Sequence, residues 1–127
     1  MEIKPNKAAK RSKQDLQNLA GMAAVLKDFQ ELYSEMTALQ MRVFIFVAMR
    51  GRCTGIEIAK GLNTLGSNVS RVVTVLSDIN VKRRKSAPLN LVELQTDPLD
   101  RRVRYVVLSE RGKVVAEAIT GHFKPNE

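Results

Sequence analysis

Residues 91–112 read LVELQTDPLDRRVRYVVLSERG. The runs 91–96 and 103–108 are rich in residues that favour β-strands. Between them lies the charged segment Asp97-Pro98-Leu99-Asp100-Arg101-Arg102, whose composition is typical of a turn. This pattern predicts a β-hairpin with a charged tip. Ser109 follows the second run and is placed to cap a helix.

Upstream of the hairpin, apolar residues recur at helical spacing. Three capping boxes mark helix starts, each with a hydroxyl residue followed three positions later by an acid or amide. The pairs are Ser12 with Asp15, Thr37 with Gln40, and Thr54 with Glu57. The near-continuous apolar run after Thr37 indicates a buried central helix that ends at Arg50-Gly51. The expected order is four helices, the hairpin and a last helix.

This order predicts a mainly α fold with a small β-hairpin wing, that is, a winged helix-turn-helix with flanking N- and C-terminal helices. The domain expectation is a basic flexible arm over 1–11 and a single winged-helix domain over 12–127. Within that domain we expect an N-terminal helix over 12–35, a winged-helix core over 37–108 and a C-terminal helix over 109–122.

Composition favours an anionic partner. The 127 residues include 21 Lys and Arg against 13 Asp and Glu, a net charge of +8. The longest apolar run, Val43 to Met49, is far shorter than the roughly 20 residues that span a bilayer. The basic N-terminus has no apolar signal segment behind it, and a single cysteine makes no internal disulfide, so we expect a cytoplasmic protein without a membrane partner.

The helix expected over 67–78 has two different faces. Its apolar residues fall on one side, and its small polar residues and one arginine fall on the other. Such a polar face suits contacts with base edges in the major groove, where arginine bonds guanine and asparagine bonds adenine. An ordinary solvated helix face is the alternative. The candidate readers are Ser67, Asn68, Ser70, Arg71 and Thr74.

The hairpin tip over 97–102 carries adjacent arginines that suit a narrow minor groove. Arg102 is the expected inserted residue, Asp100 orients it, and Arg101 and Arg104 lie beside it in sequence. A turn that is polar only because it is exposed is the alternative.

A second basic cluster, Lys82, Arg83, Arg84 and Lys85, precedes the hairpin. It would add sequence-independent affinity for DNA by releasing counterions. A solvated loop is the alternative.

The wing sequence resembles the MarR family of winged-helix regulators, whose hallmark is D-x-R in the wing followed by a strand that ends L-[ST]-x-x-G. Here Asp100-Arg101-Arg102 precedes Leu108-Ser109-Glu110-Arg111-Gly112. The resemblance runs from about Thr37 to Ile119, and TGIEIAKGL matches the family's helix before the reading helix more loosely. The link over 79–90 is longer than usual, and the C-terminal helix is brief.

The resemblance implies a homodimer in which helices from both termini intertwine two subunits, and a possible small-molecule effector whose nature is unknown. Packing of the N-terminal helix on its own domain is the alternative. The residues assigned to the dimer contact are Leu16, Leu19, Ala23, Leu26, Phe29, Val115 and Ile119.

Some relatives in that family sense oxidants through one cysteine. Cys53 lies close to Arg50 and Arg52, which could lower its pKa, but a buried packing role is the more ordinary interpretation. His122 is the one histidine, so no metal site, cofactor or catalytic group is expected.

We therefore expect a sequence-specific regulator that binds double-stranded DNA and represses transcription, rather than an enzyme. The alternatives are a protein-interaction module and a nonspecific nucleic-acid-binding or replication accessory protein.

Overall fold

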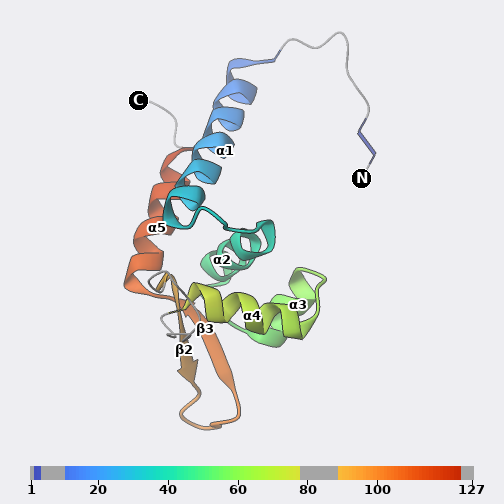
Figure 1. The fold of residues 1–127 in the computed structure, drawn as a ribbon, viewed down its shortest axis with the longest axis vertical. Helices are drawn as coiled ribbons and strands as arrows, with labels where there is room; N and C mark the ends of the chain where they lie inside the picture. The colour runs from blue at the N-terminus through green and yellow to red at the C-terminus, as the bar shows by residue number, and fades with distance from the viewer. Residues whose placement is uncertain (1, 4–10, 78–88, 124–127) are drawn as a thin grey trace.

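The computed structural model describes residues 2–3, 11–77 and 89–123. Within these ranges five helices and three short strands form a winged helix-turn-helix, as predicted (Figure 1). The elements are α1 (Lys13–Leu32), α2 (Ala38–Arg50), β1 (Arg52–Thr54), α3 (Gly55–Gly61), α4 (Gly66–Leu76), β2 (Val92–Thr96), β3 (Arg104–Leu108) and α5 (Glu110–Gly121).

All three predicted capping boxes are confirmed. The side chains of Ser12, Thr37 and Thr54 accept hydrogen bonds from the backbone three residues on, and the side chains at those positions bond back to the caps. These boxes satisfy backbone N–H groups that have no partner inside the helix. They therefore fix where α1, α2 and α3 begin.

Helix boundaries differ from the sequence predictions by a few residues. The N-terminal helix ends at Leu32 rather than at 35, because Tyr33 turns to an extended conformation. The reading helix begins at Gly66 and ends at Leu76 rather than running over 67–78. The central helix α2 is only partly buried, since Ile45 and Met49 are exposed on one side of it.

The wing is a three-stranded antiparallel sheet in the order β1-β3-β2, whereas the sequence predicted only a hairpin. The strand that the sequence did not predict is β1, in which Cys53 pairs with Val106 of β3. Three residues carry too little pattern to indicate a strand, and β1 exists because the distant β3 lies beside it. It joins the sheet directly to α3.

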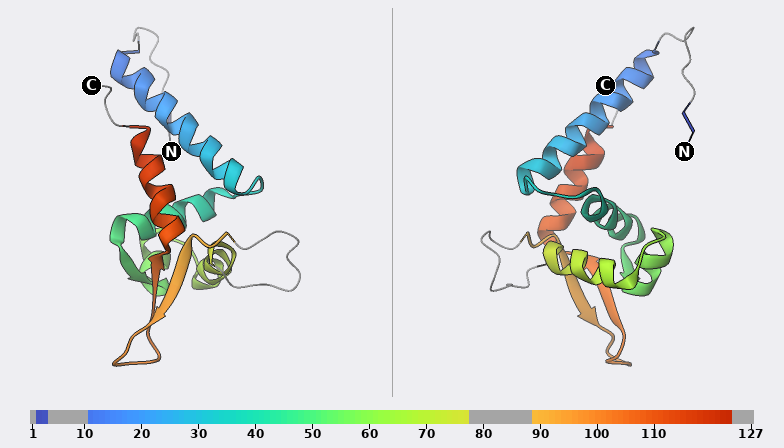
Figure 2. Two further views of the ribbon diagram at one scale, coloured as in Figure 1. Left: turned by 90° about the vertical axis from the view of Figure 1, so that its left-hand side faces the viewer. Right: turned by 45° about the vertical axis from the view of Figure 1, so that its right-hand side comes forward.

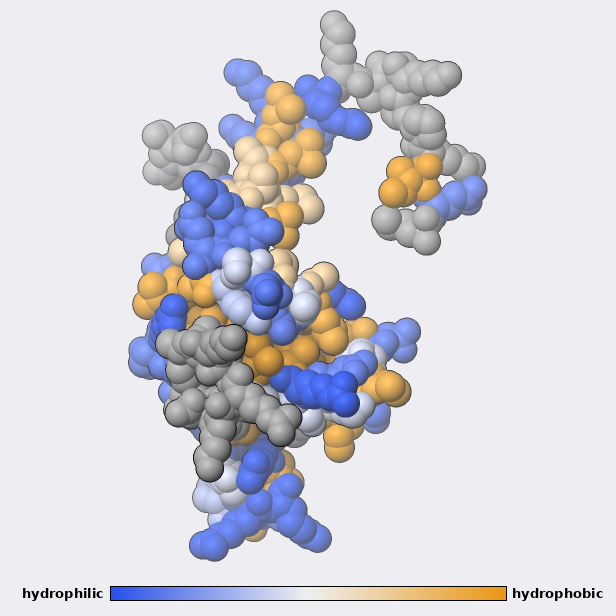
Figure 3. Space-filling model, viewed as in Figure 1, coloured by the Kyte–Doolittle hydropathy of each residue, from blue (hydrophilic) through white to orange (hydrophobic). Residues whose placement is uncertain are grey.

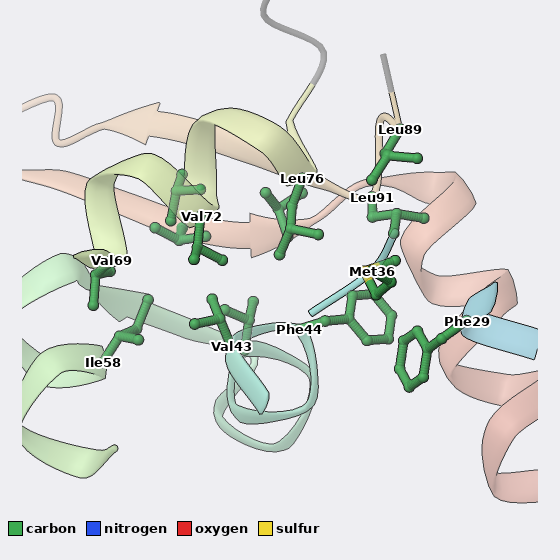
Figure 4. Packing of buried hydrophobic residues seen from close by; sticks show 14 of the residues in the cluster. Phe29, Met36, Val43, Phe44, Ile58, Val69, Val72, Leu76, Leu89 and Leu91 are labelled. Carbon is green, nitrogen blue, oxygen red and sulfur yellow. The ribbon is translucent and has the colours of Figure 1, made fainter. Parts of the chain in front are cut away.

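One apolar core joins the helices to the sheet, and α2 lies at its centre (Figure 4). The rings of Phe29 in α1 and Phe44 in α2 meet edge to face, with centroids 5.7 Å apart. Ile58 of α3 and Val69 of α4 complete the packing between the two helices of the helix-turn-helix. This core fixes the orientation of α4 relative to the sheet.

Helices α1 and α5 lie side by side at the end of the molecule opposite the wing (Figure 2). Nε2 of His122 lies 2.6 Å from Oδ2 of Asp28, which joins the C-terminal end of α5 to α1. No helix in the described part of the chain is long and apolar enough to cross a membrane.

Gly112→Ala is expected to lower the free energy of unfolding by about 1–3 kcal/mol, because an added methyl group overpacks the core. A Cβ at Gly112 would collide with the carbonyl oxygen of Leu91, a backbone atom that cannot rotate away. Gly121→Ala in the same helix is the matched control, since a Cβ there meets nothing within 4 Å. Urea denaturation measures both; equal stability of the two variants would contradict the close approach of α5 to Leu91.

Candidate nucleic-acid interface

Helix α4 presents a polar face because its apolar face is held in the core. Val69, Val72, Val73 and Leu76 are buried, so the residues between them turn outward. Ser67, Ser70 and Arg71 are exposed. The three side chains are therefore accessible to a ligand.

Two of the predicted reading residues are half-buried and engaged within the protein. Nδ2 of Asn68 donates to the hydroxyl oxygen of Thr64 at 3.2 Å, which joins α4 to the turn before it. The hydroxyl of Thr74 donates to the carbonyl oxygen of Ser70 at 2.9 Å. These two side chains therefore present less surface than Ser67, Ser70 and Arg71.

At the wing tip, Asp100 holds Arg102 in a fork. Oδ1 accepts from Nε of Arg102 at 3.1 Å, and Oδ2 accepts from Nη2 at 3.3 Å. The Asp100 carboxylate also accepts from the backbone N–H of Arg102, and these bonds lower the pKa of Asp100 below its usual value, the side-chain bonds most. The Arg102 side chain is 91% exposed, so the pair orients a cation that points into solvent.

A groove of about 790 Å³ joins the two predicted reading elements. It brings Ser70 of α4 together with Arg102 and Arg104 of the wing. Helices α3 and α4 and the wing lie toward the same end of the molecule (Figure 1). Its remaining lining residues are Thr54, Gly55, Ile56, Ala59, Lys60, Asn63, Thr64, Gly66 and Val103.

Several groove residues were not among the sequence candidates. Lys60 of α3 and Asn63 of the turn line it, and each offers hydrogen-bond donors. The segment TGIEIAKGL indicated a helix but not which side of that helix would face the wing. Conversely, Ser67, Asn68, Arg71, Thr74, Asp100 and Arg101 do not line this groove.

The basic cluster Lys82, Arg83, Arg84 and Lys85 lies outside the described residues, as does most of the N-terminal arm. The contribution of the basic cluster to DNA affinity and the flexibility of the arm stay predictions.

An apolar stripe on α1 is exposed (Figure 3). Leu16, Leu19 and Leu26 are 56%, 53% and 51% exposed, and Ala23 is exposed as well. Met22, which the sequence analysis did not include, belongs to the same stripe at 56%. These side chains do not pack on the core of their own domain.

The other residues assigned to the dimer contact differ from that stripe. Phe29 is fully buried in the core, so its assignment to an exposed contact is wrong. It lies on the side of α1 that faces the core, where its ring meets that of Phe44. Val115 and Ile119 of α5 are half-buried and pack partly against the core.

Cys53 has the properties of a packing residue. It is 1% exposed in β1. Burial raises the pKa of its thiol, the nearby Glu57 carboxylate raises it further, and the lowering by Arg50 is outweighed. The more ordinary interpretation, a buried packing residue, is therefore confirmed, and the neighbouring arginines do not activate the thiol, because a reactive cysteine requires an accessible thiolate. The described residues also contain no cluster of His, Cys, Asp and Glu that could hold a metal ion.

Solved structures share this architecture. A MarR-like transcriptional regulator from Thermotoga maritima is 30% identical; the match covers 91% of this chain and 77% of that one, with a TM-score of 0.57. A second T. maritima transcriptional regulator is 21% identical over 85% of this chain and 65% of its own, with a TM-score of 0.63.

A mutant of E. coli MarR, solved with operator DNA, is 21% identical over 84% of this chain and 67% of its own, with a TM-score of 0.57. No protein-family model and no curated protein matches the chain. Both T. maritima proteins are transcriptional regulators. The identity and coverage of the first match, together with the wing and the helix-turn-helix, show that this chain belongs to the MarR-like family of winged helix-turn-helix transcriptional regulators.

Proposed function

We propose that this protein is a homodimeric repressor that binds a specific sequence of double-stranded DNA. Helix α4 reads the major groove, and the wing tip enters the adjacent minor groove. Repression follows when the bound dimer occludes a promoter. The observation that carries the proposal is the groove in which Ser70, Arg102 and Arg104 face one space.

Charge and geometry support a duplex as the ligand. The net charge of +8 favours a polyanion. Exposed Arg71 can form a bidentate contact with guanine, and Ser67 and Ser70 can contact bases or phosphates. The paired guanidinium of Arg102 suits the enhanced negative potential of a narrow minor groove. The E. coli MarR structure with operator DNA is consistent with this assignment.

The exposed stripe on α1 supports a second copy of the chain as a further partner. Exposed leucines at helical spacing form a contiguous apolar surface, which is unusual on a monomeric protein. Packing this surface against a second copy of α1 would remove its apolar area from water, which is favourable. A two-fold dimer would place two α4 helices at half-sites about 34–36 Å apart, one helical turn of DNA.

Arg71→Ala is expected to weaken binding to the preferred duplex by about 1–3 kcal/mol and to reduce discrimination, because it removes a contact with base edges. The preferred duplex is first selected from a random library, then titrated beside a scrambled duplex at about 50 and 200 mM salt. Lys82→Ala, in the basic cluster, is expected to weaken both duplexes alike.

Lys27→Ala is the matched control. It removes one positive charge from an exposed site on α1, away from the wing, and should leave both affinities unchanged. Equal losses on both duplexes for Arg71→Ala, with no enriched sequence, would instead indicate nonspecific nucleic-acid binding. No affinity for any duplex, with a salt-insensitive protein partner, would indicate an interaction module.

A further inference from the structure

Three side chains connect the wing tip to the strand that leads into α3. The phenolic O–H of Tyr105 in β3 donates to Oδ2 of Asp97 at 3.0 Å. The guanidinium carbon of Arg52 in β1 lies over the Tyr105 ring, 4.3 Å from its centroid. We call this set the Arg52–Tyr105–Asp97 brace.

Asp97 is the end of the brace that holds the tip. Its other carboxylate oxygen, Oδ1, accepts from the backbone N–H of Leu99 at 2.8 Å. Its own backbone N–H donates to the carbonyl oxygen of Val103 at 2.9 Å. One residue thus ties together the end of β2, the turn and the start of β3. The bond from Leu99 most, and then the bond from Tyr105, hold the pKa of the Asp97 carboxyl below its usual value.

The brace lies where the sheet narrows from three strands to two. Tyr105 is opposite Thr54 of β1 on one side and Gln95 of β2 on the other. Beyond it, Arg104 is opposite Thr96 of β2 alone. A two-stranded hairpin is marginally stable without further packing. The orientation of the wing tip relative to the rest of the sheet therefore requires side-chain contacts in addition to the strand pairing.

The other end of the brace is anchored next to the helix-turn-helix. Arg52 belongs to β1, and β1 ends at Thr54, the residue that caps α3. Tyr105 and Val106 point to opposite faces of the sheet, since side chains alternate along a strand. Val106 is buried in the core, so the brace lies on the outer face, where it does not occupy the groove.

We propose that Tyr105 and Asp97 are positioning residues, which fix the direction of the wing relative to α4 so that Arg102 and the polar face of α4 contact one duplex together. The inference rests on the proposed function and extends it. Neither residue touches DNA in this arrangement; both act through Arg102. Their loss therefore matters only while Arg102 is present.

A double-mutant cycle on the selected duplex tests this inference. Tyr105→Phe removes the hydroxyl and keeps the ring under Arg52. It is expected to weaken binding by about three- to tenfold, the size of effect seen between coupled neighbours. In the Arg102→Ala background the same change should have no effect. Tyr33→Phe is the matched control, because it removes a phenolic hydroxyl that lies 3.3 Å from Glu35, away from the wing.

The outcomes separate the two proposals. A loss from Tyr105→Phe that is equal with and without Arg102, or no loss at all, overturns the positioning role and leaves the proposed function standing. Thermal unfolding of each variant identifies general destabilisation, which would persist in both backgrounds. If Arg102→Ala alone leaves affinity unchanged, or no duplex is selected, the proposed function fails and the positioning role fails with it.

Discussion

Phe29→Ala is expected to lower the free energy of unfolding by about 3–5 kcal/mol, a loss typical of removing a large aromatic side chain from a core. The ring has no exposed surface and meets Phe44 edge to face at 5.7 Å. Its removal leaves a cavity between α1 and α2 that the surrounding backbone can only partly close. Urea denaturation followed by circular dichroism measures the change.

Leu99→Ala is the control for that experiment. It truncates an apolar side chain that is 96% exposed at the wing tip, and it should change stability by no more than about 0.5 kcal/mol. A loss below about 1 kcal/mol for Phe29→Ala would show that the ring does not hold α1 on the core. The assignment of Phe29 to the dimer contact, together with the exposed stripe, would then stand.

Leu19→Asp is expected to raise the dissociation constant of the homodimer by at least about a hundredfold. A two-fold interface contains each residue twice, so one substitution removes two leucines from the contact. Each is 53% exposed in the single chain, so burying the rest is worth about half of the 1.5–3 kcal/mol of a full burial. It also places a carboxylate from each subunit in an apolar contact. Sedimentation equilibrium over a range of protein concentrations measures the constant.

Leu99→Asp makes the same chemical change at another exposed site, on the wing, and should leave the dimer intact. A dimer that tolerates Leu19→Asp would place the interface elsewhere than α1. A wild-type chain that sediments as a monomer at all concentrations would contradict the homodimer itself.

Features that depend on neighbouring residues could be predicted from the sequence. The capping boxes at Ser12, Thr37 and Thr54 each involve residues three positions apart, and all three are present in the structure. The hairpin strands differ from their predicted bounds by one residue at their starts, because strand-favouring residues and a turn of Asp and Pro lie next to one another. The fork between Asp100 and Arg102 is equally local.

Features that depend on distant residues could not be predicted. Strand β1 requires β3, and the position of Cys53 opposite Val106 follows from that pairing. The apolar period of α1 includes both Leu26 and Phe29, but only the position of α2 separates the exposed residue from the buried one. The bond from Tyr105 to Asp97 spans the hairpin, and its alignment follows from the register of β2 with β3.

At the candidate site, the positions of Lys60 and Asn63 also depend on distant residues. The sequence indicates that they belong to a helix-turn-helix, but not that α3 faces the wing across a groove. Arg71 and Ser70, by contrast, could be placed on the exposed face of α4, because the spacing of the buried valines determines that face. Amphipathic spacing thus predicts which side of a helix is exposed, while the fold determines what that side meets.

Dimethyl sulfate footprinting on the selected duplex would show which groove each element occupies. The reagent methylates guanine N7 in the major groove and adenine N3 in the minor groove. The wild-type protein should protect guanine N7 in two patches about one helical turn apart, with protected adenine N3 positions beside them. Arg71→Ala should lose the N7 protection and keep the N3 protection, and Arg102→Ala should do the reverse. A bound duplex in which every guanine N7 stays reactive would contradict the placement of α4 in the major groove.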